Sequence, residues 1–195
     1  MITQIQIIEI AGAVSSFLGV WFLRKQSILY WPFNLLSSVL CIIVFEQKGI
    51  YAQMCLQFLY IIISSYGIYN WLKHAKAGSQ LEVLHFTRKT VIYILVAGLL
   101  LTSSLYFILS HFTPSKVVFL DAFTTSFSII GTYLFTKKYI ETWLLWIAVD
   151  VVGICLFLYT GLYSMALLYL IFIGTAIQGY GLWKKSFIQN NNLSK

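Results

Sequence analysis

The feature that most constrains this chain is a series of apolar runs, each about 20 residues long. A helix of that length crosses a hydrocarbon core roughly 30 Å thick, and the runs lack the short alternating pattern of membrane strands. Hydrophobic residues make up 59% of the sequence and charged residues only 10%, which excludes an ordinary soluble domain. The sequence therefore predicts an all-α integral membrane protein.

Short polar or glycine-containing breaks divide the runs into seven predicted transmembrane helices. These are expected at about 4–23, 27–46, 50–72, 89–110, 115–136, 139–160 and 162–183. The break at Thr160-Gly161 is uncharged, but the stretch from Leu144 to Leu182 is much too long for a single crossing and is therefore divided there. The polar residues 189–195 are expected to form a flexible tail.

The basic residues follow the predicted topology. If the N-terminus lies outside, the inner loops and tail contain eleven of the 13 lysines and arginines, and the outer loops contain only Lys48 and Lys116. This bias predicts an N-out/C-in orientation. The net charge of +7 is therefore attributed to basic inner loops, which set the topology and contact anionic membrane lipid, and not to nucleic-acid binding.

The two halves of the chain resemble each other. A shift of 112 residues matches nine positions without a gap: Gly19 with Gly131, Lys25 with Lys137, Trp31 with Trp143, Phe45 with Phe157, Gly49 with Gly161, Tyr51 with Tyr163, Gly67 with Gly179, Trp71 with Trp183 and Lys73 with Lys185. Each predicted repeat contains three helices and one linker helix lies between them, so both repeats have the same orientation. The predicted organisation is a first repeat at 1–76, an inner loop and linker helix at 77–112, and a second repeat at 113–188.

The sixth predicted helix carries the strongest candidate site. Trp143, Trp146 and Asp150 are spaced i, i+3, i+7 and share one helix face. An aspartate near the middle of a span costs roughly 2.5–3.5 kcal/mol on insertion scales, which makes it a functional hypothesis by default. Two flat aromatic rings beside a carboxylate suit a planar cationic ligand. We interpret this face as half of a substrate site.

Further candidates lie on other helices. The repeat register aligns Trp31 and Asn34 with the two tryptophans of the sixth helix, and transporters built from parallel repeats bind substrate near the midplane between the repeats. Asn34 and Gln57 are candidates for substrate contact, with hydrogen bonding between neighbouring helices as the alternative. Tyr169 and Gln178 are weaker candidates.

The other tryptophans have structural interpretations. Trp71 and Trp183 are predicted to anchor the inner ends of their helices in the membrane interface. For Trp31 and Trp143, interface anchoring and an inner gate are equally consistent with the sequence. No metal, cofactor or catalytic residue is predicted, because a membrane enzyme would need a nucleophile with a base or a metal cluster. Asp150 is a lone acidic residue in the predicted core, and no histidine lies inside the predicted spans.

Several motifs resemble those of the PnuC-type vitamin transporters over nearly the whole chain. The motifs are Tyr30-Trp31-Pro32-Phe33-Asn34, Gly49-Ile50-Tyr51-Ala52, Leu56-Gln57, Tyr66-Gly67-Ile68-Tyr69-Asn70-Trp71, Asp121-Ala122-Phe123, Thr136-Lys137-Lys138-Tyr139-Ile140-Glu141-Thr142-Trp143-Leu144-Leu145-Trp146 and Gly161-Leu162-Tyr163-Ser164-Met165. The resemblance implies a bacterial inner-membrane carrier, a homotrimer with three-plus-one-plus-three helices. It also implies facilitated diffusion of a vitamin, foremost nicotinamide riboside, which a cytosolic kinase then traps. Relatives carry thiamine or riboflavin.

The resemblance also implies a site formed by a tryptophan and, four residues later, an asparagine; the matching residues here are Trp146 and Asp150. A carboxylate accepts hydrogen bonds and adds a negative charge, which favours the cations nicotinamide riboside and thiamine over neutral riboflavin. We rank nicotinamide riboside first, with thiamine as the alternative. Two alternatives lie outside the family. A SWEET-like sugar uniporter would also be built from two parallel repeats, whereas a seven-helix receptor would have the same number of spans but no internal repeat.

Overall fold

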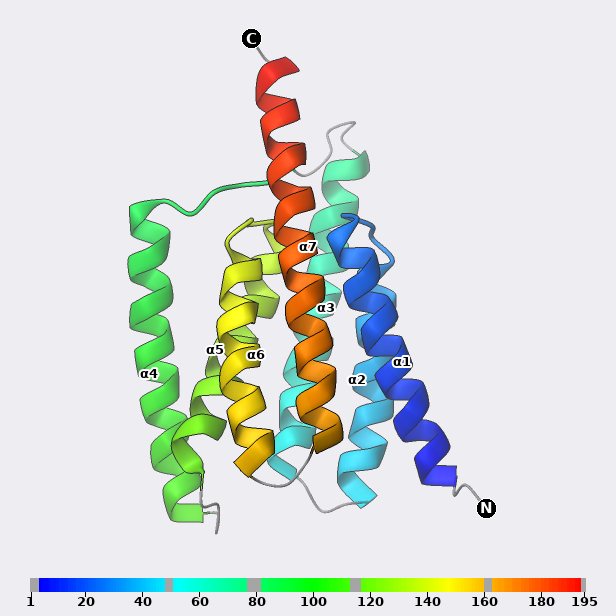
Figure 1. Ribbon diagram of the computed structural model, residues 1–195, viewed down its shortest axis with the longest axis vertical. Coiled ribbons are helices and arrows are strands. Elements are labelled where there is room, and N and C mark those ends of the chain that lie inside the picture. Colours follow the sequence, from blue (N-terminus) through cyan, green and yellow to red (C-terminus); the bar gives the residue numbers. More distant parts are fainter. Residues whose placement is uncertain (1–3, 48–50, 77–81, 113–116, 160–162, 194–195) are drawn as a thin grey trace. The chain divides into compact units, whose positions relative to one another are not determined.

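The computed structural model describes residues 4–47, 51–76, 82–112, 117–159 and 163–193 of the chain. Over these ranges the chain forms seven helices (Figure 1): α1 (Gln4–Arg24), α2 (Tyr30–Gln47), α3 (Tyr51–Lys76), α4 (Arg88–Phe112), α5 (Val118–Thr136), α6 (Thr142–Tyr159) and α7 (Tyr163–Leu193). Each begins and ends within a few residues of its prediction, except at the end of α7. The all-helical fold class is therefore confirmed.

The end of α7 differs most from the expectation. The helix continues as far as Leu193, so most of the segment expected to be a flexible tail is helical. No glycine or proline occurs between Trp183 and Leu193 to stop the helix, and the polar side chains there can remain in water on any face. The predicted breaks at Gly49 and Gly161 lie outside the described residues.

Three of the described helices contain segments that are long and apolar enough to cross a membrane on their own. These segments are Arg88–Phe112, Val118–Thr136 and Ala166–Gln189; shorter apolar stretches occupy Ile10–Arg24, Tyr30–Val44 and Thr142–Leu156. Of these three segments, the one in α4 has the highest mean hydropathy, and only 11% of its most apolar window is buried within the chain. Its exposed side chains, such as Tyr93 and Leu99, therefore suit contact with lipid.

The chain divides into two compact units. The first unit comprises Met1–Glu82 with Phe135–Lys137, and the second comprises Val83–Leu134 with Lys138–Lys195. In the first unit, α2 contacts both α1 and α3. Glycines allow α1 and α2 to approach closely, because a Cβ atom at Gly12 or Gly19 would already be in van der Waals contact with α2.

Helix α6 occupies the corresponding position in the second unit. It contacts α5 through Gly131, which faces the indole of Trp146, and it contacts α7 through Gly153, which faces the ring of Tyr169. Helix α4 also contacts α5, where Gly98 lies against Phe127. Each unit is therefore organised around one middle helix, α2 or α6.

A buried pair of tryptophans joins the middle helix to the third helix in each unit. In the first unit, Trp31 and Trp71 meet edge to face at 5.7 Å with an interplanar angle of 89°. In the second unit, Trp143 and Trp183 meet at 5.5 Å and 86°. All four indoles are 5% exposed or less, so the prediction that Trp71 and Trp183 anchor in the membrane interface is wrong. Packing between helices competes for the same side chains and buries them.

Tight turns connect the first and middle helices of each unit. Gln26 has a φ of 57° and Lys138 a φ of 55°, and these are the non-glycine residues with positive φ in the described parts of the chain. The left-handed conformation is uncommon for residues other than glycine. The two residues are 112 positions apart, the same spacing that separates the tryptophan pairs.

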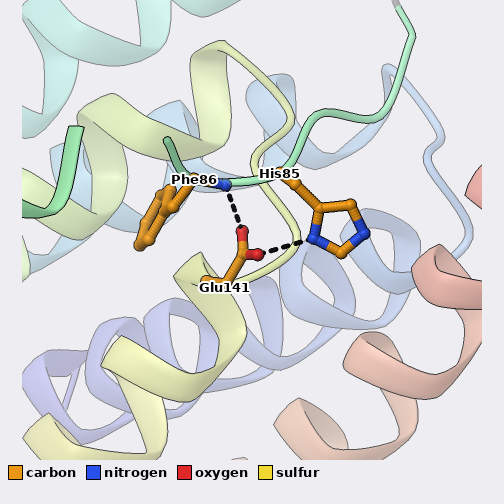
Figure 2. A network of polar contacts seen from close by, with 3 residues as sticks. All are labelled: His85, Phe86 and Glu141. Atoms are coloured by element: carbon orange, nitrogen blue, oxygen red, sulfur yellow. Dashed lines mark hydrogen bonds and ion pairs between the residues drawn. The ribbon is translucent and has the colours of Figure 1, made fainter. Parts of the chain in front are cut away.

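An extended segment, residues 83–87, runs along the turn before α6. The Leu84 amide donates to the Lys138 carbonyl at 3.0 Å, and the Ile140 amide donates to the Leu84 carbonyl at 2.9 Å. The Glu141 carboxylate holds the same segment (Figure 2), because it lies 2.6 Å from the His85 ring nitrogen and accepts from the Phe86 amide at 2.9 Å. These bonds tie the start of α4 to the start of α6 within the second unit.

Candidate functional site

The candidate site on α6 is a continuous helical face. Trp143, Trp146 and Asp150 all lie within the unbroken helix Thr142–Tyr159, so the face predicted from their spacing exists. Trp143 is only 2% exposed, and its ring lies over Gly179 of α7. It therefore forms a fixed, buried end to this face, and its role in the structure is helix packing.

Trp146 lies one turn further along α6 and is partly exposed. Its indole is held close to α5, because a Cβ atom at Gly131 would come within 2.7 Å of the indole Nε1. Glycine at position 131 thus lets the ring lie close against the neighbouring helix. A partly exposed indole held in this way can offer an aromatic surface to a ligand.

Asp150 is the most unusual side chain in the second unit. Its residue is 2% exposed, and its carboxylate atom Oδ1 is buried without a hydrogen-bond partner among the described residues. Buried carboxylates elsewhere in proteins are normally paired with a cation or satisfied by donors. This carboxylate is therefore suited to receive a donor or a positive charge from a ligand.

The two candidates on α7 lie at different levels. Tyr169 packs on Gly153, about one turn from Asp150, and its ring is 6.0 Å from that of Phe172. Gln178 is exposed and adjoins Gly179, the residue that faces Trp143, so it lies about two turns from the level of Asp150. Measured along the helix axis, Tyr169 therefore lies close to Asp150 of α6, and Gln178 does not.

The candidates of the first unit are engaged in packing to different degrees. The Asn34 side-chain amide donates to the Ser64 hydroxyl at 2.7 Å, which joins α2 to α3. Trp31 is fully buried on Gly67 of α3. These two contacts show how α2 and α3 align as antiparallel helices. In this alignment, Gln57 of α3 lies opposite a position on α2 that is about two turns from Asn34. Asn34 and Gln57 are therefore not brought together.

Some polar residues that the sequence did not single out have clear structural roles. Asn70, 8% exposed, donates to the Thr136 carbonyl at 2.8 Å within the first unit. Lys138 is 5% exposed in the turn before α6, and burial lowers the pKa of its ammonium group to about 8. Glu141 holds the 83–87 segment. Their shared signal in the sequence is a polar residue next to a predicted helix end, which is too common to distinguish them.

The site has the chemistry of a binding surface. Aromatic rings and one buried carboxylate lie on a helix within an apolar bundle, and this arrangement can hold a ligand by stacking and by charge. Together with the polytopic helical fold, it defines a multi-pass membrane transporter.

The family model described as the nicotinamide mononucleotide transporter matches residues 6–185, and the chain belongs to this family. It is accordingly a transporter of the bacterial inner membrane and not an enzyme.

Named relatives and a solved structure agree with this assignment. The chain is 27% identical to the nicotinamide riboside transporter PnuC of Escherichia coli (strain K12), over 92% of this chain and 85% of the relative. It is 28% identical to the protein of the same name from Neisseria mucosa, over 89% of this chain and 70% of the relative. The crystal structure of the vitamin B3 transporter PnuC matches with a TM-score of 0.75 at 26% identity, covering 92% of this chain and 81% of that one. The resemblance to PnuC-type transporters is thereby confirmed.

Proposed function

We propose that this chain carries nicotinamide riboside across the bacterial inner membrane by facilitated diffusion. The observation that carries the proposal is the buried carboxylate of Asp150 on the same α6 face as the indole of Trp146. Nicotinamide riboside carries a planar, cationic pyridinium ring, which an indole can stack against and a carboxylate can neutralise. The relatives named for this substrate support the same choice.

The carboxylate also helps to choose between the two ligands that the comparisons name. Nicotinamide mononucleotide, in the family description, differs from the riboside by a phosphate group, which makes its net charge negative near neutral pH. A buried carboxylate would repel that phosphate, whereas it attracts the cationic riboside. Thiamine is also a cation with aromatic rings, and it is therefore the second candidate.

The proposed architecture consists of two parallel three-helix repeats joined by α4, with the N-terminus outside and the C-terminus inside. Matching tryptophan pairs, matching turns with positive φ, and middle helices α2 and α6 support the repeat. The lysine and arginine bias supports the orientation. We further propose a homotrimer in contact with membrane lipid, in which the apolar outer surface of α4 accommodates lipid or a second subunit.

In the proposed mechanism, the substrate stacks on Trp146 and its cationic ring pairs with Asp150. Tyr169 lies close enough along α7 to supply a second aromatic contact. The other predicted contacts are Asn34, Gln57, Gln178, Trp31 and Trp143. Rocking of one repeat against the other opens the site to each side in turn. A cytosolic kinase then traps the vitamin by phosphorylation, which gives the transport its direction.

Counterflow in proteoliposomes tests the proposal. Vesicles containing purified protein and unlabelled nicotinamide riboside should take up labelled nicotinamide riboside from outside, and vesicles without protein should not. Asp150→Leu and Trp146→Ala should each reduce the rate at least tenfold. Val151→Ala is the matched control, because Val151 is next to Asp150 on α6 but 49% exposed, and it should retain the rate.

The competing substrates are distinguished in the same assay. Unlabelled thiamine inside the vesicles should drive little uptake of labelled nicotinamide riboside. If thiamine drives counterflow of labelled thiamine and nicotinamide riboside drives none, thiamine is the substrate. Full activity of Asp150→Leu with nicotinamide riboside would refute the site.

A further inference from the structure

Gly153 extends the candidate site face of α6 by one turn. Trp146, Asp150 and Gly153 are spaced i, i+4, i+7, so they lie along one stripe of the helix. Gly153 is buried, and the ring of Tyr169 from α7 lies against it. A Cβ atom at position 153 would come within 2.5 Å of the ring atom Cε1 and 2.7 Å of Cδ1. One edge of the tyrosine ring therefore occupies the place that a side chain at this position would take.

This glycine is not shared by the two halves of the chain. In the register of 112 residues, Gly67 pairs with Gly179, and each of these glycines lies against a tryptophan ring. Position 153 instead pairs with Cys41, and position 169 pairs with Gln57. The helix packing common to both halves therefore does not require glycine at position 153. Its reason lies in what is particular to α6, which is the neighbouring carboxylate of Asp150.

The chemistry of the proposed substrate determines which part of it reaches Tyr169. In nicotinamide riboside the positive charge is centred on the ring nitrogen, and the ribose is bonded to that same nitrogen. With the ring stacked on Trp146 and its charge paired with Asp150, the ribose continues from the level of Asp150. On the other side of Trp146 the face ends at Trp143, which is 2% exposed and packed on α7. The ribose therefore extends along α6 toward Gly153 and Tyr169.

We propose that Gly153 is a positioning residue that sets the specificity of the site for the riboside. Without a side chain at position 153, the ring of Tyr169 reaches a level about 4.5 Å from Asp150 along the helix axis. There it closes this end of the site and contacts the ribose. A tyrosine ring offers an apolar face, and its hydroxyl can both donate to and accept from ribose hydroxyl groups. The inference rests on the proposed function, because it assigns a role beside the proposed substrate site.

Alanine at position 153 tests this placement. To reach ordinary van der Waals contact with the new Cβ atom, the ring of Tyr169 must move by roughly 1 Å. The Kd for nicotinamide riboside, measured by calorimetry on the detergent-purified protein, should therefore rise about three- to tenfold in Gly153→Ala. Gly174→Ala is the matched control, because Gly174 is an exposed glycine of α7 where a Cβ atom would meet nothing within 4 Å. Gly174→Ala should keep the Kd of the intact protein.

A double-mutant cycle shows whether Gly153 acts through Tyr169. Tyr169→Ala should raise the Kd for the riboside about tenfold. Added to Tyr169→Ala, Gly153→Ala should change the Kd by less than about twofold, because the ring that it displaces is already gone. A larger change would show that Gly153 acts independently of Tyr169, and the inference would be wrong. This comparison stands even where Gly153→Ala alone does not fold, because the double variant lacks the steric overlap.

A shorter ligand assigns the contact to the ribose. The nicotinamide cation methylated on its ring nitrogen keeps the planar charged ring and lacks the ribose. Its Kd, measured by displacement of bound riboside, should agree within about twofold between the intact protein and Tyr169→Ala. A general disturbance of the fold would weaken the binding of both ligands alike. If the Kd of this analogue rises as much as that of the riboside, Tyr169 does not contact the ribose and the inference is overturned.

The same titrations separate failure of this inference from failure of the proposed function. If the intact protein binds nicotinamide riboside and the Kd is unchanged in Gly153→Ala and Tyr169→Ala, the role of Gly153 is refuted and the proposed function stands. No binding of nicotinamide riboside by the intact protein would refute the proposed function itself, and this inference with it.

Discussion

Replacing Gly179 of α7 by alanine is expected to destabilise the fold, although alanine is the better helix former. A Cβ atom at this position would lie 2.6 Å from the Cε2 and Cζ2 atoms of Trp143, which is closer than carbon atoms approach in proteins. The indole cannot withdraw easily, because it is 2% exposed and its ring also meets Trp183 edge to face. The helices must therefore move apart to admit a single methyl group.

The magnitude follows from two opposing effects. Overpacking a well-filled contact costs ~1–3 kcal/mol. Alanine in place of glycine within a helix contributes ~1 kcal/mol in the other direction. Gly174→Ala isolates the second effect, because Gly174 is exposed on the same helix and an added Cβ atom there would meet nothing within 4 Å. Gly179→Ala should therefore be less stable than Gly174→Ala by ~1–3 kcal/mol.

Thermal unfolding of the detergent-purified variants measures this difference. Gly174→Ala should melt at or above the temperature of the parent protein, and Gly179→Ala several degrees below Gly174→Ala. Gly67→Ala should behave like Gly179→Ala, since its Cβ atom would lie 2.5 Å from the ring of Trp31. Equal melting temperatures for Gly179→Ala and Gly174→Ala would show that the close contact is not the reason for glycine at position 179.

Three further predictions concern the polar residues near the helix ends and the joint between α2 and α3. Burial lowers the pKa of Lys138 to about 8, so the unfolded chain binds that proton more tightly, and stability falls as the pH drops from about 10.5 towards 8. Lys138→Met should therefore raise the melting temperature at pH 7 and have a smaller effect at pH 10; equal effects at both would refute this reasoning. Glu141→Gln removes the carboxylate that binds His85 and the Phe86 amide. Hydrogen exchange of the Phe86 amide should therefore become faster, and an unchanged exchange rate would contradict this prediction. Ser64→Ala removes the partner of the Asn34 amide and should lower the free energy of unfolding by about 1 kcal/mol in denaturant titration; a parent-like stability would mean that this bond contributes nothing.

Much of the fold follows from local properties of the chain. Apolar runs of about 20 residues can satisfy their backbone groups in a membrane only as helices, which is why the predicted helix positions agree with the structure. The end of α7 was missed because a polar helix has no apolar face, so residues 189–193 resemble a tail in the sequence.

The candidate site was predictable to a lesser extent. Trp146 and Asp150 could be placed on one face because they lie on a single helix, whose geometry relates them directly. The level of Gln178 on α7, the bond between Asn34 and Ser64, and the burial of Trp71 depend on how two helices pack. How one helix is aligned along another cannot be read from the spacing of residues within either helix.

The sequence by itself determined the class of the protein, the helices and the acidic, aromatic face of α6, because each depends on hydrophobicity and periodicity along a continuous segment. Only the tertiary structure decided which polar groups are satisfied. It joins Asn34 to Ser64 and Glu141 to the 83–87 segment, and it leaves Oδ1 of Asp150 buried without a partner among the described residues. The physical reason is that desolvation and pairing depend on side chains brought together from different helices, and no single segment contains both partners.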